Sequence, residues 1–263
     1  MTYTQALILG IVQGLTEFLP VSSSGHLILV PRLFGWPDQG LAFDAAMHLG
    51  TLGALFAYFR VELIELATGE MDRSVAALLI VASIPALAVG WLANAWIEAN
   101  LRSATIIAAA TALWALVMWW ADRRAGESRA AAGDPLTRVS LRQGLTVGCA
   151  QVLALLPGTS RSGITISAGL FARLDRATAA RFSFMLGIPV TGAAGAYKLL
   201  HLLRDGISPG EGGPLALAIL VAFLSGWLAV WFLVNYLKRR SLLPFVIYRL
   251  ILAAVIFFVI FRG

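Results

Sequence analysis

Long apolar stretches recur along this chain, and a bilayer is the environment that suits them. A bilayer core of about 30 Å is crossed by a helix of roughly 20 apolar residues. Only 13% of the residues are charged, whereas soluble domains average about 25%. We therefore predict an all-α polytopic membrane protein with six transmembrane helices. These are expected at about 43–59, 75–97, 104–121, 181–200, 214–236 and 244–262.

Two further pairs of apolar segments are too short to span. The first pair, 4–19 and 22–33, is interrupted by Pro20 and a run of serines. The second pair, 141–156 and 160–172, is interrupted in the same way. Broken helix pairs at membrane depth are typical of re-entrant hairpins, so the sequence predicts two of them.

The basic residues are distributed unevenly between the two sets of loops. With six spans, thirteen Lys or Arg residues fall on one side and four on the other. The first group is Arg60, Arg73, Arg123, Arg124, Arg129, Arg138, Arg142, Arg173, Arg176, Arg181, Lys238, Arg239 and Arg240; the second is Arg32, Arg102, Arg204 and Arg262. Because cytoplasmic loops are enriched in Lys and Arg, the first group is expected in the cytoplasm and both termini outside. Membrane topology thus accounts for the net charge of +6, and no nucleic-acid partner is expected.

The chain also contains an internal repeat. A shift of 138 residues aligns residues 5–28 with 143–166, with nine of 24 positions identical. Three spans separate the copies, so the second hairpin should enter from the opposite face. We predict inverted repeat halves, 1–122 and 139–263, joined by a cytoplasmic linker at 123–138. In such folds the binding site lies where the broken helices meet.

The first hairpin contains a carboxylate, Glu17, which is costly in an apolar segment. Gln13 and Glu17 are four residues apart and share one helix face. A carboxylate within the membrane indicates function by default. Gln13 is a candidate substrate ligand, although it and its repeat partner Gln151 could instead bridge helices.

Hydroxyls and an imidazole follow directly. Ser22, Ser23, Ser24 and Gly25 open the second helix of the hairpin, and His26 comes next. Their hydroxyls and free N–H groups suit phosphate oxygens, although helix capping alone would also favour serine here. His26 can supply a proton donor, a base or a nucleophilic nitrogen near neutral pH.

The second hairpin offers a cation in place of the acid. Arg161 is the only charged residue between Arg142 and Arg173, and its planar fork suits bidentate phosphate contact. The alternative is a structural ion pair with Glu17. The surrounding candidates for substrate binding are Gly158, Thr159, Ser160, Ser162, Gly163 and Thr165.

Other polar residues in the apolar segments give weaker signals. Asp44 and His48 share a helix face and could flank the site. Tyr248 and Arg249 could contact substrate, but packing is favoured. The single cysteine, Cys149, lies in an apolar context and is expected to be buried.

The two motifs together resemble those of the undecaprenyl-diphosphatase family, bacterial membrane enzymes linked to bacitracin resistance. The matching positions are Gln13, Glu17, Pro20, Ser22, Ser23, Gly25 and His26 in the first motif, and Pro157, Gly158, Ser160, Arg161, Ser162, Gly163 and Thr165 in the second. Residues 182–189 and 244–249 also look like family sequence. Gln13 stands where some members have glutamate, which weakens any scheme with two carboxylates on a metal.

The resemblance implies the hydrolysis of undecaprenyl diphosphate to the monophosphate and inorganic phosphate. It further implies dependence on a divalent metal and a site open to the periplasmic side of the bacterial cytoplasmic (inner) membrane. A polyprenyl diphosphate and membrane lipids are the expected partners. Whether the chain forms a homodimer is left open.

Charge suggests the role of each residue. Arg161 and nearby N–H groups would hold the phosphates, and Mg²⁺ or Ca²⁺ would bridge Glu17 and the diphosphate. Ser23 is the preferred nucleophile, with Glu17 or His26 as its base and His26 as the acid. Ser22, His26 itself or a metal-held water stay open as the attacking group. A lipid carrier that uses the same headgroup site is the competing hypothesis.

Overall fold

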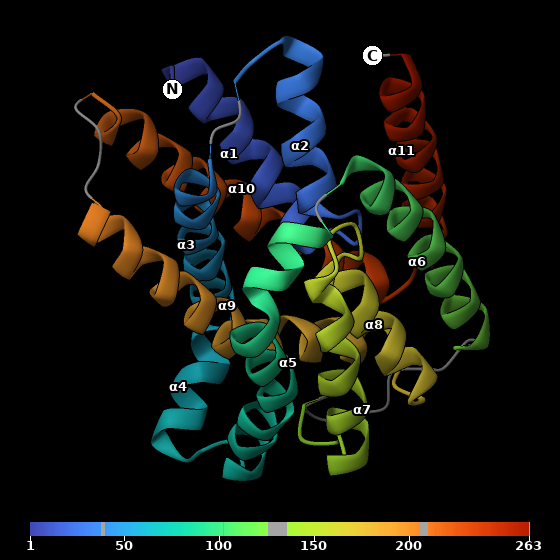
Figure 1. The fold of residues 1–263 in the computed structure, drawn as a ribbon. Helices are drawn as coiled ribbons and strands as arrows, with labels where there is room; N and C mark the ends of the chain where they lie inside the picture. Colours follow the sequence, from blue (N-terminus) through green and yellow to red (C-terminus); the bar gives the residue numbers. More distant parts are fainter. Residues whose placement is uncertain (38–39, 102, 126–135, 206–209, 263) are drawn as a thin grey trace.

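The computed structural model describes residues 1–37, 40–101, 103–125, 136–205 and 210–262, and within these ranges it contains helices and no strand (Figure 1). The helices are α1 (Tyr3–Phe18), α2 (Ser23–Phe34), α3 (Leu41–Tyr58), α4 (Arg60–Thr68), α5 (Arg73–Asn100), α6 (Ala104–Arg124), α7 (Leu141–Gln151), the 3₁₀ turn η1 (Val152–Leu155), α8 (Arg161–Phe171), α9 (Arg176–Asp205), α10 (Gly212–Leu237) and α11 (Leu243–Arg262). The prediction of an all-α fold is confirmed.

Several of these helices have the length and composition of membrane spans. Among the described residues, three stretches qualify, Arg73–Ala93, Ala104–Arg124 and Gly212–Leu237, with mean hydropathies of 2.3, 1.7 and 2.5. Large apolar side chains face outward, as with Trp91 at 81% and Leu92 at 75% exposure. Apolar surface on helices of this length and composition suits a lipid environment, so the molecule is a polytopic membrane protein.

The two interrupted segments form matching hairpins. In Figure 1, α1 runs inward from the end of the molecule that carries the N-terminus, and α7 runs inward from the opposite end. Each first helix begins with the same capping box, Thr2 with Gln5 and Ser140 with Gln143. These residues are 138 apart, so the repeat seen in sequence extends to local geometry.

The breaks also match in conformation. Ser22 has φ 75° and ψ 98°, and Ser160 has φ 69° and ψ 110°. Positive φ is costly for a residue with a side chain. Both turns hold the same strained conformation at the same repeat position, which turns the chain sharply into α2 and α8.

Each hairpin packs closely on a helix of the other half of the chain. α1 lies along α10, where a Cβ on Gly10 would meet the Ala218 carbonyl at 2.9 Å. α7 lies along α5, where a Cβ on Gly148 would collide with the Ala82 carbonyl. Glycine permits this backbone contact, and the two halves are interlocked.

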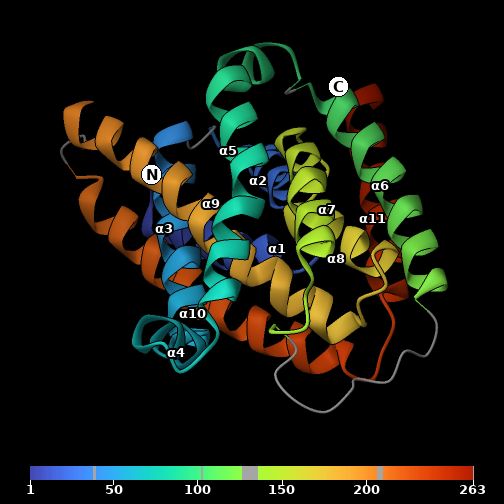
Figure 2. The same ribbon diagram turned by 90° about the horizontal axis from the view of Figure 1, so that it is seen from below.

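The remaining helices enclose these hairpins. α6 and α11 pack side by side, as Figures 1 and 2 both show. α3 crosses α9, and α8 packs between α7, α9 and α6. A large apolar core includes Phe18 and Phe184, whose rings meet edge to face at 5.6 Å. That core lies directly beside Glu17 and Ser183, and so gives the candidate site a rigid base.

Some expectations need correction. Cys149 is exposed rather than buried, because α7 turns one apolar face outward, and a lipid-facing surface is as apolar as a core. The loop at 60–74 contains the unexpected helix α4, and the span expected at 181–200 belongs to a helix running from Arg176 to Asp205. The proposed linker falls largely on residues 126–135, outside the described ranges.

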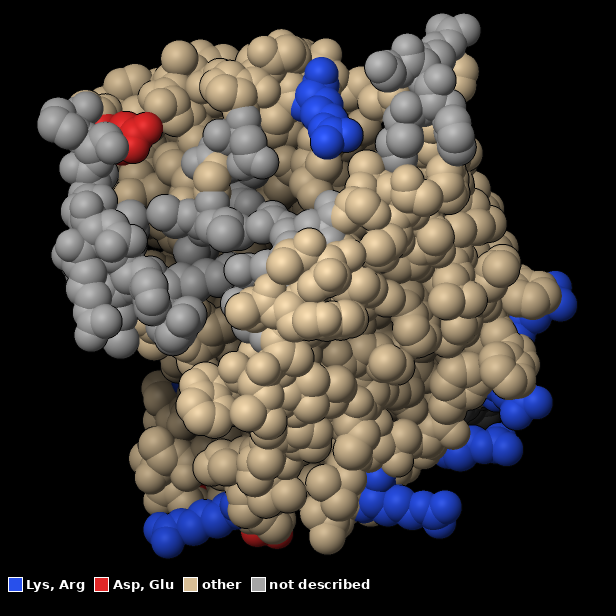
Figure 3. Space-filling view, viewed as in Figure 1, with Lys and Arg blue, Asp and Glu red and all other residues tan. Residues whose placement is uncertain are grey.

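The exposed charges gather at one end. Figure 3 shows most of the visible Lys and Arg side chains at the lower end, away from the N-terminus. Two ion pairs join helices: Asp122 of α6 pairs with Arg176 of α9, and Glu62 of α4 pairs with Arg181 of α9.

Candidate active site

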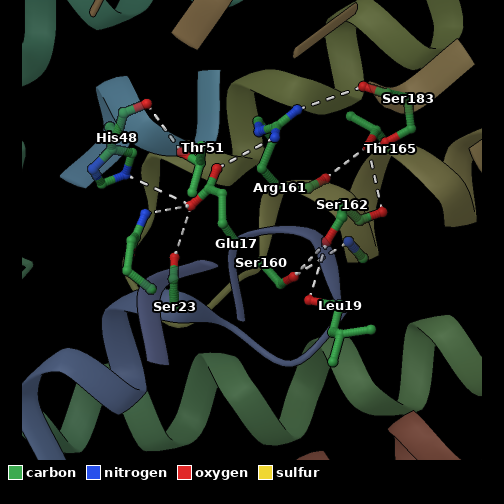
Figure 4. Close-up of polar contacts among 12 residues, drawn as sticks. Glu17, Leu19, Ser23, His48, Thr51, Ser160, Arg161, Ser162, Thr165 and Ser183 are labelled. Carbon is green, nitrogen blue, oxygen red and sulfur yellow. Dashed lines mark hydrogen bonds and ion pairs between the residues drawn. The ribbon is translucent and has the colours of Figure 1, made fainter. Parts of the chain in front are cut away.

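The two hairpin turns meet inside the molecule and are joined by hydrogen bonds. The Gly158 N–H donates to Ser24 Oγ at 3.2 Å. Ser162 Oγ donates to the Leu19 carbonyl at 3.3 Å (Figure 4). The two motifs, 138 residues apart in the chain, thus lie together, where the sequence predicted a shared site.

Glu17 lies at the centre of this site and is 8% exposed. Its Oε2 accepts hydrogen bonds from Gln13 Nε2 at 3.3 Å and from Ser23 Oγ at 3.1 Å. His48 Nε2 is 3.6 Å from the same oxygen. Arg161 NH2 donates to Oε1 at 3.3 Å. Figure 4 shows Ser23, His48 and Arg161 converging on this one carboxylate.

Arg161 begins α8 and points back toward the first hairpin. Besides Glu17, its guanidinium contacts the Ser183 carbonyl through NH1 at 3.5 Å, and its Nε has no partner among the described residues. The absence of a side chain on Gly187 makes room for it, because a Cβ there would collide with the guanidinium. The structural ion pair between Arg161 and Glu17 therefore exists, and the Nε–H of Arg161 is left without a partner among the described residues.

The start of α8 is held rigidly by its own hydroxyls. Ser160 Oγ accepts the Gly163 N–H at 3.3 Å and lies 3.3 Å from Ser162 Oγ. Thr165 Oγ1 donates to the Arg161 carbonyl at 2.7 Å and pairs with Ser183 Oγ at 2.5 Å. The first N–H groups of a helix have no partner within it, so this turn presents donors suited to an anion.

The loop before α8 is shaped by a glycine and a buried arginine. Gly158 has φ 93°, and a Cβ there would collide with the Ile107 carbonyl. Arg249, only 1% exposed, donates to the carbonyls of Gly158 at 2.9 Å and Thr159 at 3.0 Å. It also donates to the Thr111 carbonyl at 3.2 Å. Arg249 therefore holds the loop and α6 together, and the packing role favoured from sequence is what the structure shows.

His26 lies away from the carboxylate. Its Nδ1 is 2.7 Å from the Ser22 carbonyl and its Nε2 is 2.6 Å from Tyr248 Oη. Both ring nitrogens thus have partners, and His26 braces the serine turn against α11. The imidazole beside Glu17 and Ser23 belongs to His48 of α3, which the sequence placed only at the edge of the site. The signal in the sequence for this role of His48 was a polar residue within an otherwise apolar span.

A cavity of about 290 Å³ opens beside Glu17. Ligand pockets usually measure about 300–1,000 Å³, so this one suits a headgroup better than a whole lipid. Its polar lining is formed by Thr16, Glu17, Ser22, Ser23, Ser24, His48, Gln151, Ser160, Arg161 and Thr191. An apolar wall is supplied by Ala86, Ala154, Leu155, Leu156, Val190 and Ala194.

The glycine candidates differ in what they do. A Cβ on Gly25 would make ordinary contacts at 3.8 Å, whereas one on Gly163 would approach Ser160 Oγ at 3.3 Å. Gly163 therefore keeps the α8 turn tight, and its N–H is used within that turn. Thr159 is fully buried and its Oγ1 has no partner among the described residues.

The donor set can be compared with what a hard divalent cation needs. No group of three or more His, Cys, Asp or Glu residues within reach of one ion occurs in the described part of the chain. Glu17 already accepts several donors, but Gln13 Oε1 beside it is buried without a partner. One carboxylate and one amide oxygen fit a Mg²⁺ or Ca²⁺ ion only when substrate phosphates complete the shell, a common arrangement for Mg²⁺.

Comparison with known proteins adds an independent finding. A model of the family described as bacitracin resistance protein BacA matches residues 6–255. Proteins named undecaprenyl-diphosphatase from Hahella chejuensis and Alteromonas mediterranea are each 42% identical to this chain. The alignments cover 97% of both chains for the first, and 99% of this chain and 100% of the relative for the second. Undecaprenyl-diphosphatase 2 of Stutzerimonas stutzeri is 45% identical over 100% of both chains.

Proposed function

This chain belongs to the BacA bacitracin resistance protein family, and from that membership we propose that it is a membrane phosphatase acting on undecaprenyl diphosphate. The products are undecaprenyl phosphate and inorganic phosphate, so the enzyme recycles a lipid carrier for cell-wall synthesis. One observation carries the proposal at the level of the site. The Ser23 hydroxyl donates a hydrogen bond to one oxygen of the buried Glu17 carboxylate, and Arg161 donates to the other. All three residues line one cavity.

Ser23 is the proposed nucleophile and Glu17 its base. Glu17 Oε2 accepts the proton as Ser23 Oγ attacks the terminal phosphorus, and the bond from that phosphorus to the bridging oxygen breaks. Undecaprenyl phosphate departs, and water then hydrolyses the phosphoserine to release inorganic phosphate. The 3.1 Å contact between Ser23 and Glu17 supports this order of events.

Arg161 and the first turn of α8 are proposed to hold the phosphates. Positioning and charge neutralisation dominate phosphoryl transfer, and the free Nε of Arg161 is a donor for that purpose. His26 is proposed to keep the serine turn in place through Ser22, because both of its nitrogens are engaged. This revises the acid–base role expected of His26 from sequence.

A divalent metal remains part of the proposal. Glu17 and the amide oxygen of Gln13 would hold Mg²⁺ or Ca²⁺ together with diphosphate oxygens. When bound, the ion would neutralise charge on the phosphates. The residues already described bind and orient the headgroup and move the serine proton.

The proposed topology is six spans with two re-entrant hairpins that enter from opposite faces, in halves 1–122 and 139–263. The opposite directions of α1 and α7 and the matched serine turns support it. The basic end would face the cytoplasm and the cavity the periplasm of the bacterial inner membrane. Whether the chain forms a homodimer stays open.

The test is phosphate release from undecaprenyl diphosphate by the purified protein in detergent. Wild type and Arg161→Ala are compared with added Mg²⁺ or Ca²⁺ and with EDTA. We expect metal-dependent release by wild type and a loss of at least a hundredfold in the variant. Folded wild type that releases no phosphate, but moves the lipid across a vesicle, would overturn the proposal in favour of a carrier.

A further inference from the structure

Gln151 lines the same cavity as Glu17 and Arg161, yet neither motif includes it. It is the last residue of α7 and is only 1% exposed. Its repeat partner, Gln13, donates to Glu17 at 3.3 Å. The sequence left open whether Gln151 simply bridges helices.

The structure gives Gln151 no bridging partner. Both its Oε1 and its Nε2 are buried without a hydrogen bond among the described residues. Leaving buried polar atoms unpaired is unfavourable, and a leucine of similar size would avoid the cost. A buried carboxamide in contact with a cavity is therefore best explained by a ligand that it binds.

The position of Gln151 within the cavity indicates which part of a ligand it meets. Ser22, Ser23, Ser160 and Arg161 supply polar lining from the two turns. The residues that follow Gln151, Ala154, Leu155 and Leu156, supply apolar lining, as does Ala86 of the neighbouring α5. Gln151 is thus a polar lining residue that directly precedes the apolar lining residues of η1 in the chain.

Resting on the phosphatase activity proposed above, we infer that Gln151 binds the phosphate attached to the lipid chain. That phosphate joins the anionic headgroup to an apolar tail, so it suits a polar lining residue next to apolar ones in the chain. The Nε2 amide donates to a phosphate oxygen, and Oε1 accepts from a water molecule. Gln151 is then a residue that places the leaving group, while Arg161 and Ser23 act on the terminal phosphate.

The test compares Gln151→Leu with wild type in three measurements: kinetics on undecaprenyl diphosphate, inhibition by the two products, and thermal unfolding in detergent. We expect a KM about tenfold or more higher, the scale of one hydrogen bond to a charged group. The inhibition constant of undecaprenyl phosphate rises in step, and that of inorganic phosphate stays unchanged. The unfolding temperature is unchanged or higher, because the variant removes two unpaired polar atoms.

Gln143→Leu is the matched control on the same helix. Gln143 binds Ser140 and the Ala172 carbonyl, so its loss lowers the unfolding temperature and leaves KM unchanged. Gln151→Glu keeps the size and adds a negative charge, and it should weaken binding more than leucine does.

Two results would overturn the inference. The first is a Gln151→Leu variant with wild-type KM and unaltered inhibition by undecaprenyl phosphate. The second is tighter binding of lipid diphosphate by Gln151→Glu, which would assign Oε1 to a cation instead. If wild type releases no phosphate, the proposed phosphatase function is wrong. That outcome differs from the two above, in which wild type is active and only the inferred role of Gln151 is wrong.

Discussion

At the scale of single residues, Glu17 is the acceptor on which the site depends. Three donors surround its two oxygens, from Gln13, Ser23 and Arg161, and His48 Nε2 lies 3.6 Å from Oε2. Such a carboxylate fixes the positions of its neighbours as well as accepting a proton. A change at Glu17 should therefore affect both activity and stability.

Glu17→Gln should lower kcat by a factor of about 100 to 10,000, the range for loss of a positioned base. It should also lower the unfolding temperature, since the nearby Arg161, at 12% side-chain exposure, loses its counter-charge. Glu62→Gln is the control, because Glu62 pairs with Arg181 away from the cavity. It should cost stability and keep kcat. Normal turnover by Glu17→Gln would remove Glu17 from the mechanism.

Ser23 and its neighbour Ser24 allow a second comparison. Ser23→Ala removes the proposed nucleophile and should reduce phosphate release by at least a thousandfold. Ser24→Ala loses the bond from the Gly158 N–H and the contact with Ser22 Oγ, but it keeps the proposed nucleophile and should retain measurable activity. The readouts are single-turnover phosphate release and capture of a phosphorylated enzyme. If Ser23→Ala turns over normally and His26→Ala does not, the serine scheme is wrong.

Gly187 has no side chain, and this leaves space for the Arg161 guanidinium. Gly187→Ala would drive a methyl group into the Arg161 guanidinium, and we expect at least a tenfold fall in kcat/KM because a misplaced cation binds phosphate poorly. Gly192→Ala on the same helix α9 meets only Leu52 at 3.9 Å and should be nearly neutral. Equal activities of the two variants would show that Arg161 tolerates displacement.

At the scale of elements, the loop between η1 and α8 depends on a helix far away in the chain. Arg249 of α11 holds the carbonyls of Gly158, Thr159 and Thr111. A carbonyl left buried without a donor costs about 1–3 kcal/mol. The arrangement explains how this arginine is buried with carbonyls, and no carboxylate, as its partners among the described residues.

Arg249→Met should therefore destabilise the protein by about 2 kcal/mol or more, because three carbonyls lose their donors. Arg249→Lys should rescue only part of this, since one ammonium group cannot reproduce the fork. Thermal unfolding and phosphate release are measured together, and both should fall. Full stability of Arg249→Met would mean that the loop holds its shape unaided.

The elements themselves were largely predictable, and the reasons are local. Helix breaks at Pro20 and Pro157, and the nine-residue identity of the repeat, indicated both hairpins. The two positive-φ serines were not predicted, because nothing in a serine run specifies that conformation. The 3₁₀ turn η1 and helix α4 were missed for a similar reason: short apolar helices lack a distinctive period.

Residues brought to the site by tertiary packing were harder to predict. His48 was expected only at the edge of the site, and Gly187 was not singled out at all. Each acts on a residue of another helix, Glu17 and Arg161 respectively. Which faces of two helices meet depends on the close contacts of α1 with α10 and α3. A pattern read along one helix contains no information about that neighbour.

At the scale of the whole molecule, the distribution of charge predicts an orientation that can be measured. In a Cys149→Ser background, single cysteines are introduced at Phe34 and Arg239, which are both exposed. A maleimide that cannot cross the inner membrane is added to intact cells whose outer layers let it through. It should label position 34 and not position 239. Permeabilised cells should be labelled at both positions. The reverse pattern would invert the proposed topology.

The placement of α11 has a consequence for how the protein is made. This helix supplies Tyr248, which braces the first serine turn, and Arg249, which braces the second loop. Among the described helices it also leaves the ribosome last. A nascent chain that has inserted every earlier helix still lacks the bonds that set both turns. We therefore expect catalytic competence to arrive late in synthesis, so that a chain lacking α11 releases no phosphate from the lipid.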